Sequence, residues 1–311
     1  GVPKVDIERA SDKIKVILLD QASLDWGKEQ NGWSWPWPRE VYGPIIDFCA
    51  RGGAKVVAFD VLYTEASVYG VSDDEALGAA IGRAPAFVGS VFLSDKTGEF
   101  TNWPAEYPRR DRLIAGLTPW LAENRGRQVN FGKATFPIPE VATNVSMLGN
   151  VADQPDVDGI FRRSSLFGVF DGQVLPSLGL AAFLAAEEKS GARLDLRLED
   201  RVLHVMNRKV PVDSSGRAVL HFYGRSGTHQ AFSAAGVIES ELMLREGQPA
   251  KIDPSILKDC YVFFGFSAPG LLDLRPTPIS RVYPGVEIHA TMLDNLLSLL
   301  FLREVPAHAS I

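Results

Sequence analysis

Two near-continuous apolar runs, each ending in aspartate, decide the fold: residues 14–20 read IKVILLD and residues 55–60 read KVVAFD. Runs of this kind are typical of strands buried on both faces, as in parallel sheets. Between them, residues 41–52 carry apolar side chains at helical spacing, and a pair of glycines predicts the end of that helix. Residues 14–60 are therefore predicted to form a strand–helix–strand unit with a right-handed crossover.

The rest of the chain continues this alternation of strands and helices. Further strands are predicted at residues 86–93, 146–151, 164–170 and 261–266. Helices are predicted at residues 72–81, 109–122, 178–188 and 285–302, the first with a capping box of Ser72 and Glu75. Residues 192–223 change to a period of two, which predicts an antiparallel meander, and Asp171-Gly172 predicts a hairpin turn.

These elements together predict an α/β fold: a mixed, largely parallel sheet flanked by helices, with an antiparallel β-rich excursion at about residues 192–223. No clean linker interrupts the sequence, so residues 1–311 are expected to form a single domain.

The composition is that of a globular protein with a sizeable core. The 311 residues are 46% hydrophobic and 23% charged, and the formal net charge of −6 provides no overall basic field for nucleic acid. Cys49 and Cys260 form no CxxC pair and lie in apolar runs, so free, buried thiols are expected, with one disulfide as the alternative. Charged residues interrupt residues 4–15, so no signal peptide is recognised, and no apolar stretch reaches the roughly 18 residues of a membrane span.

The sequence lacks the common catalytic signatures. Residues 265–270 read GFSAPG, with proline where the second glycine of a nucleophile elbow would stand. The first strand is not followed by a phosphate-binding glycine motif, and neither a P-loop nor an HExxH motif occurs. His289 lies on the apolar face of the C-terminal helix and is predicted to be a core residue. We therefore expect no catalytic residue, no metal site and no cofactor.

One constellation of polar residues remains. Asp20 and Asp60 end two of the predicted parallel strands, and Ser267 follows a third. Ligands of open α/β sheets bind outside the carboxyl ends of the strands. Glu65 follows Asp60 by five residues, and Asp273 lies on the same loop as Ser267. Carboxylates gathered there can bind Mg²⁺ or Ca²⁺ or act as acid and base, whereas the structural alternative is that a strand-end aspartate caps the following turn.

A tryptophan- and proline-rich stretch is a second candidate for binding. Residues 33–39 read WSWPWPR and are predicted to belong to a loop after the first strand. Tryptophans in such a loop either pack it onto the edge of the sheet or stack on a ligand or partner. The candidate ligand-binding residues are therefore Asp20, Trp35, Arg39, Asp60, Glu65, Ser267 and Asp273.

Taken together, several segments resemble the type-two CHASE sensor domain. They are the LD and SL pairs at 19–20 and 23–24, WPWPR at 35–39, GAKVVAFDVLYTE at 53–65, DVDGIFRR at 156–163, LPSLGL at 175–180, FGFSA at 264–268 with Asp273 and Thr277-Pro278, and PGVEIHA at 284–290. The segments keep the order of the family and span about residues 14–302. Gln21 stands where the family often carries a second acid, which argues against a fixed two-acid metal pair at that strand.

The resemblance implies an extracytoplasmic, periplasmic sensory domain of a bacterial inner-membrane receptor, without catalytic activity of its own. Such domains are joined to adenylate cyclases, to histidine kinases of two-component systems or to serine/threonine kinases, so a transmembrane helix is expected beyond this chain. The expected partners are an unidentified small-molecule or protein stimulus, the membrane in the full receptor, and a second copy in a homodimer. The helix at residues 285–302 is expected to carry the signal toward the membrane.

Two other functions stay open at this point. One is a divalent-metal-dependent α/β enzyme that uses Asp20, Asp60 and Glu65. The other is a periplasmic protein-interaction module that recognises its partner through the tryptophan-rich loop.

Overall fold

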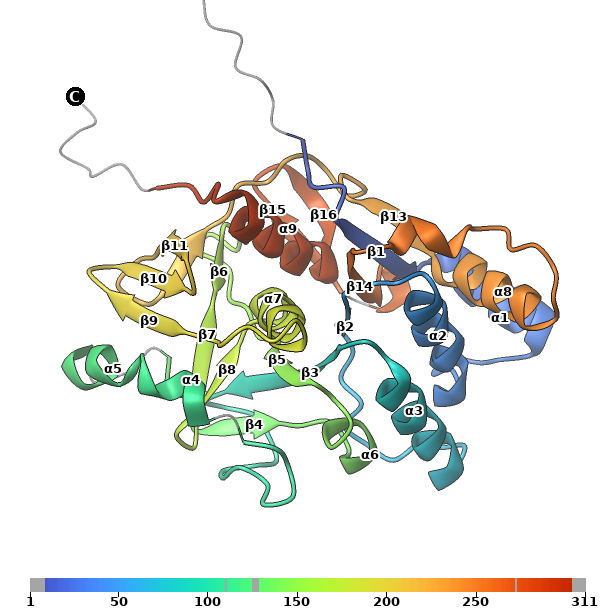
Figure 1. The fold of residues 1–311 in the computed structure, drawn as a ribbon, viewed down its shortest axis with the longest axis horizontal. Coiled ribbons are helices and arrows are strands. Elements are labelled where there is room, and N and C mark those ends of the chain that lie inside the picture. Colours follow the sequence, from blue (N-terminus) through green and yellow to red (C-terminus); the bar gives the residue numbers. More distant parts are fainter. Residues whose placement is uncertain (1–8, 110, 125–128, 272, 304–311) are drawn as a thin grey trace, which may run out of the picture.

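The computed structural model describes residues 9–109, 111–124, 129–271 and 273–303. Its centre is a seven-stranded sheet in which β13, β1, β14, β2 and β3 are neighbours in that order, and β3 also pairs with β4 and β5 (Figure 1). The strands are β1 (Ile14–Leu19), β2 (Val56–Phe59), β3 (Phe87–Ser94), β4 (Lys133–Thr135), β5 (Met147–Asn150), β13 (Gln230–Ser233) and β14 (Tyr261–Phe266). Only β4 runs antiparallel to its neighbour in this sheet. The predicted α/β class, with a mixed and largely parallel sheet, is confirmed.

The central strands are buried on both faces, as their continuous apolar sequences predict. β14 pairs with β1 along its whole length and, on its other side, with β2. It therefore separates the two strands at residues 14–20 and 55–60, which are parallel but not adjacent. The local sequence does not reveal this insertion, because β14 comes from near the other end of the chain.

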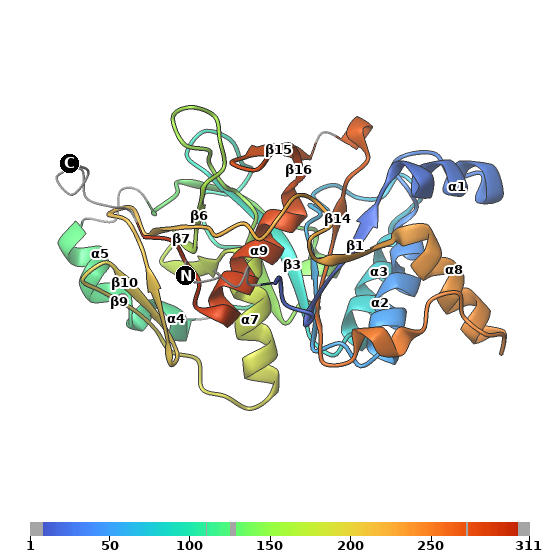
Figure 2. The same cartoon turned by 90° about the horizontal axis from the view of Figure 1, so that it is seen from above.

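Helices cover both faces of the sheet (Figure 2). On one face lie α7 (Leu178–Lys189) and α9 (Gly285–Ser298). On the other lie α1 (Gln21–Asn31), α2 (Gly43–Arg51), α3 (Val71–Arg83) and α8 (Ala234–Arg245). Successive side chains of β2 alternate between the two hydrophobic cores, because side chains of a strand point to opposite faces in turn: Val56 and Ala58 join the first core, Val57 and Phe59 the second.

Several local predictions differ from the structure. Residues 21–31, where no helix is predicted, form α1; the stretch is too polar to show an apolar face, but the carboxylate of Asp20 caps it by accepting the N–H of Ser23 at 2.8 Å. α3 begins at Val71, after Gly70, so Ser72 is not its cap. The helix predicted at 109–122 is two short helices, α4 (Asp111–Ala115) and α5 (Thr118–Asn124); residue 110 lies outside the described residues. β13 and α8 have no counterpart in the prediction.

The antiparallel excursion is present as a sheet of β9 (Leu196–Glu199), β10 (Val202–Val205) and β11 (Arg208–Pro211). β12 (Arg217–Val219) leaves it and pairs with β6 (Arg163–Ser165). β7 (Phe167–Phe170) and β8 (Gln173–Pro176) form the predicted hairpin, whose turn residues Asp171 and Gly172 have φ of 46° and 70°. Both values are positive, as the tight hairpin turn requires.

Short elements complete the chain. β15 (Leu274–Thr277) and β16 (Ser280–Pro284) form a hairpin that leads directly into α9. The remaining elements are α6 (Pro139–Ala142) and the 3-10 helices Arg39–Tyr42, Pro254–Leu257 and Pro269–Leu271. Cys49 and Cys260 are buried and free, as predicted. Within the described ranges, the helices are too short or too polar to cross a membrane.

Candidate functional site

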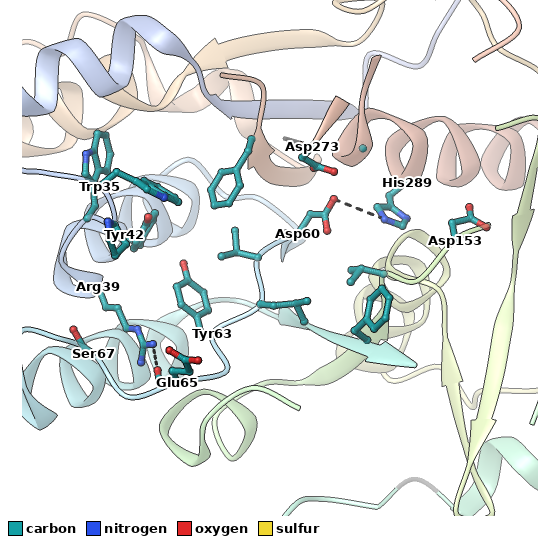
Figure 3. Close-up of a pocket in the computed structure, with 18 of the residues that line it drawn as sticks. Trp35, Arg39, Tyr42, Asp60, Tyr63, Glu65, Ser67, Asp153, Asp273 and His289 are labelled. Carbon is teal, nitrogen blue, oxygen red and sulfur yellow. Dashed lines mark hydrogen bonds and ion pairs between the residues drawn. The ribbon is translucent and has the colours of Figure 1, made fainter. Parts of the chain in front are cut away.

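A pocket of about 490 Å³ opens at the carboxyl edge of the sheet. Its wall is formed by residues at or just beyond the ends of β2, β14 and β5, by the β15 hairpin and by the first turns of α9 (Figure 3). This is the edge at which open α/β sheets bind ligands. The volume suits a small molecule rather than a polymer.

One end of the pocket gathers two carboxyl groups and a histidine. Asp60 follows β2, Asp273 precedes β15, and His289 projects from α9. Nε2 of His289 lies 3.8 Å from Oδ2 of Asp60, too far for a hydrogen bond. Arg275 donates from Nη2 to Oδ1 of Asp273 at 3.3 Å. A Cβ at Gly285 would lie 2.5 Å from the same Oδ1, so glycine at the start of α9 leaves the space that this carboxyl group occupies.

Burial governs the protonation of this cluster. Desolvation raises the pKa of Asp60 to about 7, against the opposing effect of Arg275. Burial and then repulsion from Asp60 raise the pKa of Asp273 to about 7 as well. Burial lowers the pKa of His289 to about 4, so its imidazole is neutral at pH 7. At neutral pH the cluster therefore contains acidic groups but no histidine charge to balance them.

A third buried carboxyl group lies in the segment after β5. Oδ1 of Asp153 accepts the N–H groups of Gln154 and Ser165 at 3.1 and 3.3 Å. Its Oδ2 is buried and has no hydrogen-bond partner among the described residues. Desolvation raises the pKa of Asp153 to about 7, and its hydrogen bonds lower that pKa only in part.

The opposite end of the pocket is aromatic (Figure 3). The indole of Trp35 meets the ring of Phe266 edge to face at 5.2 Å, and the rings of Tyr42 and Tyr63 lie 5.8 Å apart. Tyr63 is only 7% exposed, and its hydroxyl points toward the middle of the pocket with no partner among the residues that the structure describes. Burial raises the pKa of both tyrosines, so their hydroxyls stay neutral.

Arg39 is held at the rim of the aromatic end. Its guanidinium donates to Asp74 and to the backbone carbonyl of Glu65, and it lies 5.4 Å from the centre of the Tyr63 ring. Asp73 accepts the backbone N–H of Arg39 at 2.8 Å. The segment that carries Trp35 is thereby tied to the start of α3 and to the loop after β2.

A family model described as the CHASE2 domain matches residues 4–310, nearly the whole chain. The chain belongs to the CHASE2 family. The resemblance drawn from the sequence is confirmed, and with it the assignment to a family of extracytoplasmic sensor domains of receptors. The comparisons with curated proteins and with solved structures give no significant match.

Most of the candidate residues line the pocket of this CHASE2 domain. They are Trp35, Arg39, Asp60, Glu65 and Asp273. Asp20 lies outside the wall, because its carboxylate accepts the N–H and the hydroxyl of Ser23 and caps α1. Ser267 is also outside; its N–H donates to the carbonyl of Leu19 at 3.2 Å. For Asp20 the structural alternative is therefore the one that the geometry supports.

The three carboxylates considered for a metal enzyme are not brought together. Asp60 and Glu65 line the pocket, whereas Asp20 is engaged in capping. Across the described part of the chain, His, Cys, Asp and Glu side chains form no group of three or more that could hold a metal ion. The geometry thus gives no support to the divalent-metal alternative.

Three residues of the pocket escaped the sequence analysis. His289, predicted as a core residue, is indeed buried, at 5% exposed, but it lines the pocket opposite Asp60. Its helical spacing is that of a core residue, so the sequence contains no signal for its second role. Asp153 was detectable, because it closely follows the predicted strand at 146–151 and the strand-end rule applies there as well. Tyr63 has no such signal.

α9 connects the pocket with the start of the described chain. Its first residues, Gly285, Ile288 and His289, line the pocket. Further along the helix, Oδ2 of Asp294 accepts the N–H of Ser11, just before β1, at 2.8 Å. The 14 residues of α9 span about 21 Å at 1.5 Å per residue. One rigid element thus touches both the ligand-binding edge of the sheet and the opposite edge.

Buried polar side chains hold α9 in place. Glu287 is fully buried and accepts the N–H of Gly227 at 2.9 Å. Asn295 is also fully buried and exchanges two hydrogen bonds with the backbone of His221, at 2.7 and 2.9 Å. Buried polar groups without partners are costly, so α9 can move only if these bonds are broken or exchanged together. This favours a small number of discrete positions for the helix over continuous motion.

Proposed function

We propose that this CHASE2 domain senses a small molecule in the pocket and passes the signal to its receptor through α9. The observation that carries the proposal is the placement of one helix: Ile288 and His289 form part of the pocket wall, and Asp294 of the same helix binds the segment before β1. A ligand that fits one position of α9 better than another shifts the population toward that position. The sensor domain itself is proposed to be non-catalytic.

A small molecule is favoured over a protein partner by the state of the tryptophan-rich loop. Trp33 and Trp37 pack edge to face on each other and on Trp26, at 5.5 to 6.3 Å between ring centres. Trp35 is 44% exposed but turns toward the pocket and Phe266. These contacts support the packing interpretation for Trp33 and Trp37, and they direct Trp35 to the pocket rather than to a second protein.

The rest of the receptor is proposed from the family. The domain would lie on the periplasmic side of the inner membrane, with α9 leading toward a transmembrane helix and a cytoplasmic kinase or cyclase. A homodimer would suit either type of output module. The pocket and the first turn of α9 would then receive the signal, and the last turn of α9 would pass it on toward the membrane.

Filling the pocket tests this proposal in the receptor that carries the domain. Ala66 is exposed and lines the pocket, so Ala66→Trp places a bulky ring in the cavity without disturbing the core. We expect the receptor output to become fixed and no longer to follow the conditions that change it in the wild type. Ala105→Trp is the matched control, since Ala105 is exposed and outside the pocket. An Ala66→Trp receptor that still responds like the wild type would overturn the proposal.

A further inference from the structure

We infer that the pocket binds an organic cation: a protonated amine attached to an apolar group about the size of one ring. The inference rests on the proposed function, because it takes the pocket as the sensing site. Three features of the wall carry it: an excess of carboxyl groups, buried polar atoms that lack partners, and an aromatic surface at the other end of the cavity.

The charges of the wall favour a cation. Two guanidinium groups line the pocket in the described part of the chain, and both already have acidic partners. Arg39 forms an ion pair with Asp74, and Arg275 forms one with Asp273. The carboxyl groups that line it are those of Asp60, Glu65, Asp153 and Asp273. A buried carboxylate is costly unless it is paired, so a bound cation would offset that cost. A bound anion would add to that cost.

Buried polar atoms without partners point to a hydrogen-bonding ligand. The Tyr63 side chain is more than nine-tenths buried, and its unpartnered hydroxyl is directed into the cavity (Figure 3). An ammonium group has three N–H donors and no acceptor, so it needs several acceptors around it. The carboxyl oxygens of Asp60 and Asp273 are acceptors at the acidic end of the pocket, and the hydroxyl of Tyr63 is a further polar atom that faces the middle of the cavity. We place the ammonium between Asp60 and Asp273, which lie together at the acidic end of the pocket (Figure 3).

The aromatic end explains why the cation is organic rather than a metal ion. Trp35 and Tyr42 lie across the cavity from the acidic end (Figure 3), and the ring of Phe266 packs edge to face on Trp35. Such rings bury the apolar part of a ligand, and their faces attract a nearby positive charge. The described residues offer no group of three or more ligands for a metal ion, whereas one ring with a short amine-bearing chain is compatible with about 490 Å³.

A matched set of three probes tests the charge requirement in the 311-residue chain. Phenethylamine is cationic, 2-phenylethanol is neutral and 3-phenylpropanoate is anionic, while all three share a phenyl ring on a short chain. Calorimetric titration at pH 8, where Asp60 and Asp273 are mainly ionised, should give a phenethylamine affinity about tenfold or more above that of 2-phenylethanol, because charge-assisted hydrogen bonds are stronger than neutral ones. The anion should bind more weakly than either.

Variants locate the charge that is recognised. Asp60→Asn and Asp273→Asn keep the shape of the side chain but remove its charge, so each should reduce the preference for phenethylamine over 2-phenylethanol by about tenfold. Glu246→Gln, on an exposed residue outside the pocket, should leave the preference unchanged. Equal affinity for amine and alcohol, tighter binding of the acid, or no binding of phenethylamine would overturn the cation inference. The Ala66→Trp output experiment decides the role of the pocket independently of these results.

Discussion

Replacing Gly179 by alanine is expected to lower the free energy of unfolding by about 2 kcal/mol, because a methyl group has no room between α7 and α9. A Cβ at Gly179 would lie 2.5 Å from the carbonyl oxygen of His289 and 2.8 Å from Cε of Met292. The first contact is with backbone, so relief requires α9 to move away from α7. Because His289 also lines the pocket, the substitution should disturb the site together with the stability. Urea denaturation measures the change directly.

The same substitution elsewhere in a helix supplies the control. A Cβ at Gly82 in α3 would lie 3.6 Å from Oδ1 of Asn144, an ordinary contact. Gly82→Ala should therefore raise the free energy of unfolding by about 0.5 to 1 kcal/mol, because alanine favours helix over glycine. If both substitutions stabilised the protein to the same extent, the close approach of α7 and α9 would be wrong.

Replacing Asp153 by asparagine is expected to stabilise the domain, and the stabilisation should grow as pH rises from about 4 to about 7 and then level off. The pKa of Asp153 is raised to about 7 in the folded protein and is about 4 in an unfolded chain. Between these values the folded state holds the proton and the unfolded state does not, so the stability that the protonated carboxyl group contributes falls as pH rises from about 4 to about 7 and is lost above pH 7. Asparagine does not ionise, and its side-chain oxygen can still accept the N–H groups of Gln154 and Ser165.

The expected signature is a difference between two pH values. From pH 5.5 to 8.5, the stability of Asp153→Asn relative to the wild type should rise by about 2 kcal/mol, since one unit of pKa shift corresponds to about 1.4 kcal/mol. The raised pKa values of Asp60 and Asp273 also make the free energy of unfolding fall as pH rises, whereas the lowered pKa of His289 makes it rise with pH below pH 6.5. These contributions are the same in the wild type and in Asp153→Asn, so they cancel in the difference between the two proteins. A relative stability that does not change with pH would contradict the burial of an unpaired carboxyl group at this position.

The sequence predicts the fold where local pattern and tertiary structure agree. Continuous apolar runs identify β1, β2 and β14, and the alanine- and leucine-rich stretch identifies α7. The insertion of β14 between β1 and β2 depends on contacts between distant segments, which no local pattern contains. α1 was missed because its stability comes from the Asp20 cap and from tertiary packing rather than from an apolar face.

The sequence predicts the candidate site only in part. The strand-end rule placed Asp60 in the pocket because its backbone direction is fixed by the sheet. The same rule selected Asp20, which instead caps the helix that immediately follows it. Only the structure places His289 and Tyr63 in the pocket. A buried residue has the same sequence pattern whether it packs in the core or lines a cavity, so the sequence does not separate the two cases.

Amide hydrogen exchange over α9 is the measurement that tests the central claim most directly. The 311-residue chain would be compared with its Ala66→Trp and Ala105→Trp variants, with exchange followed by mass spectrometry. If pocket occupancy is coupled to α9, Ala66→Trp should change exchange along Gly285–Ser298 and at the segment around Ser11, whereas Ala105→Trp should leave both regions as in the wild type. A change confined to the loop around residue 66, with α9 unaffected, would contradict the account.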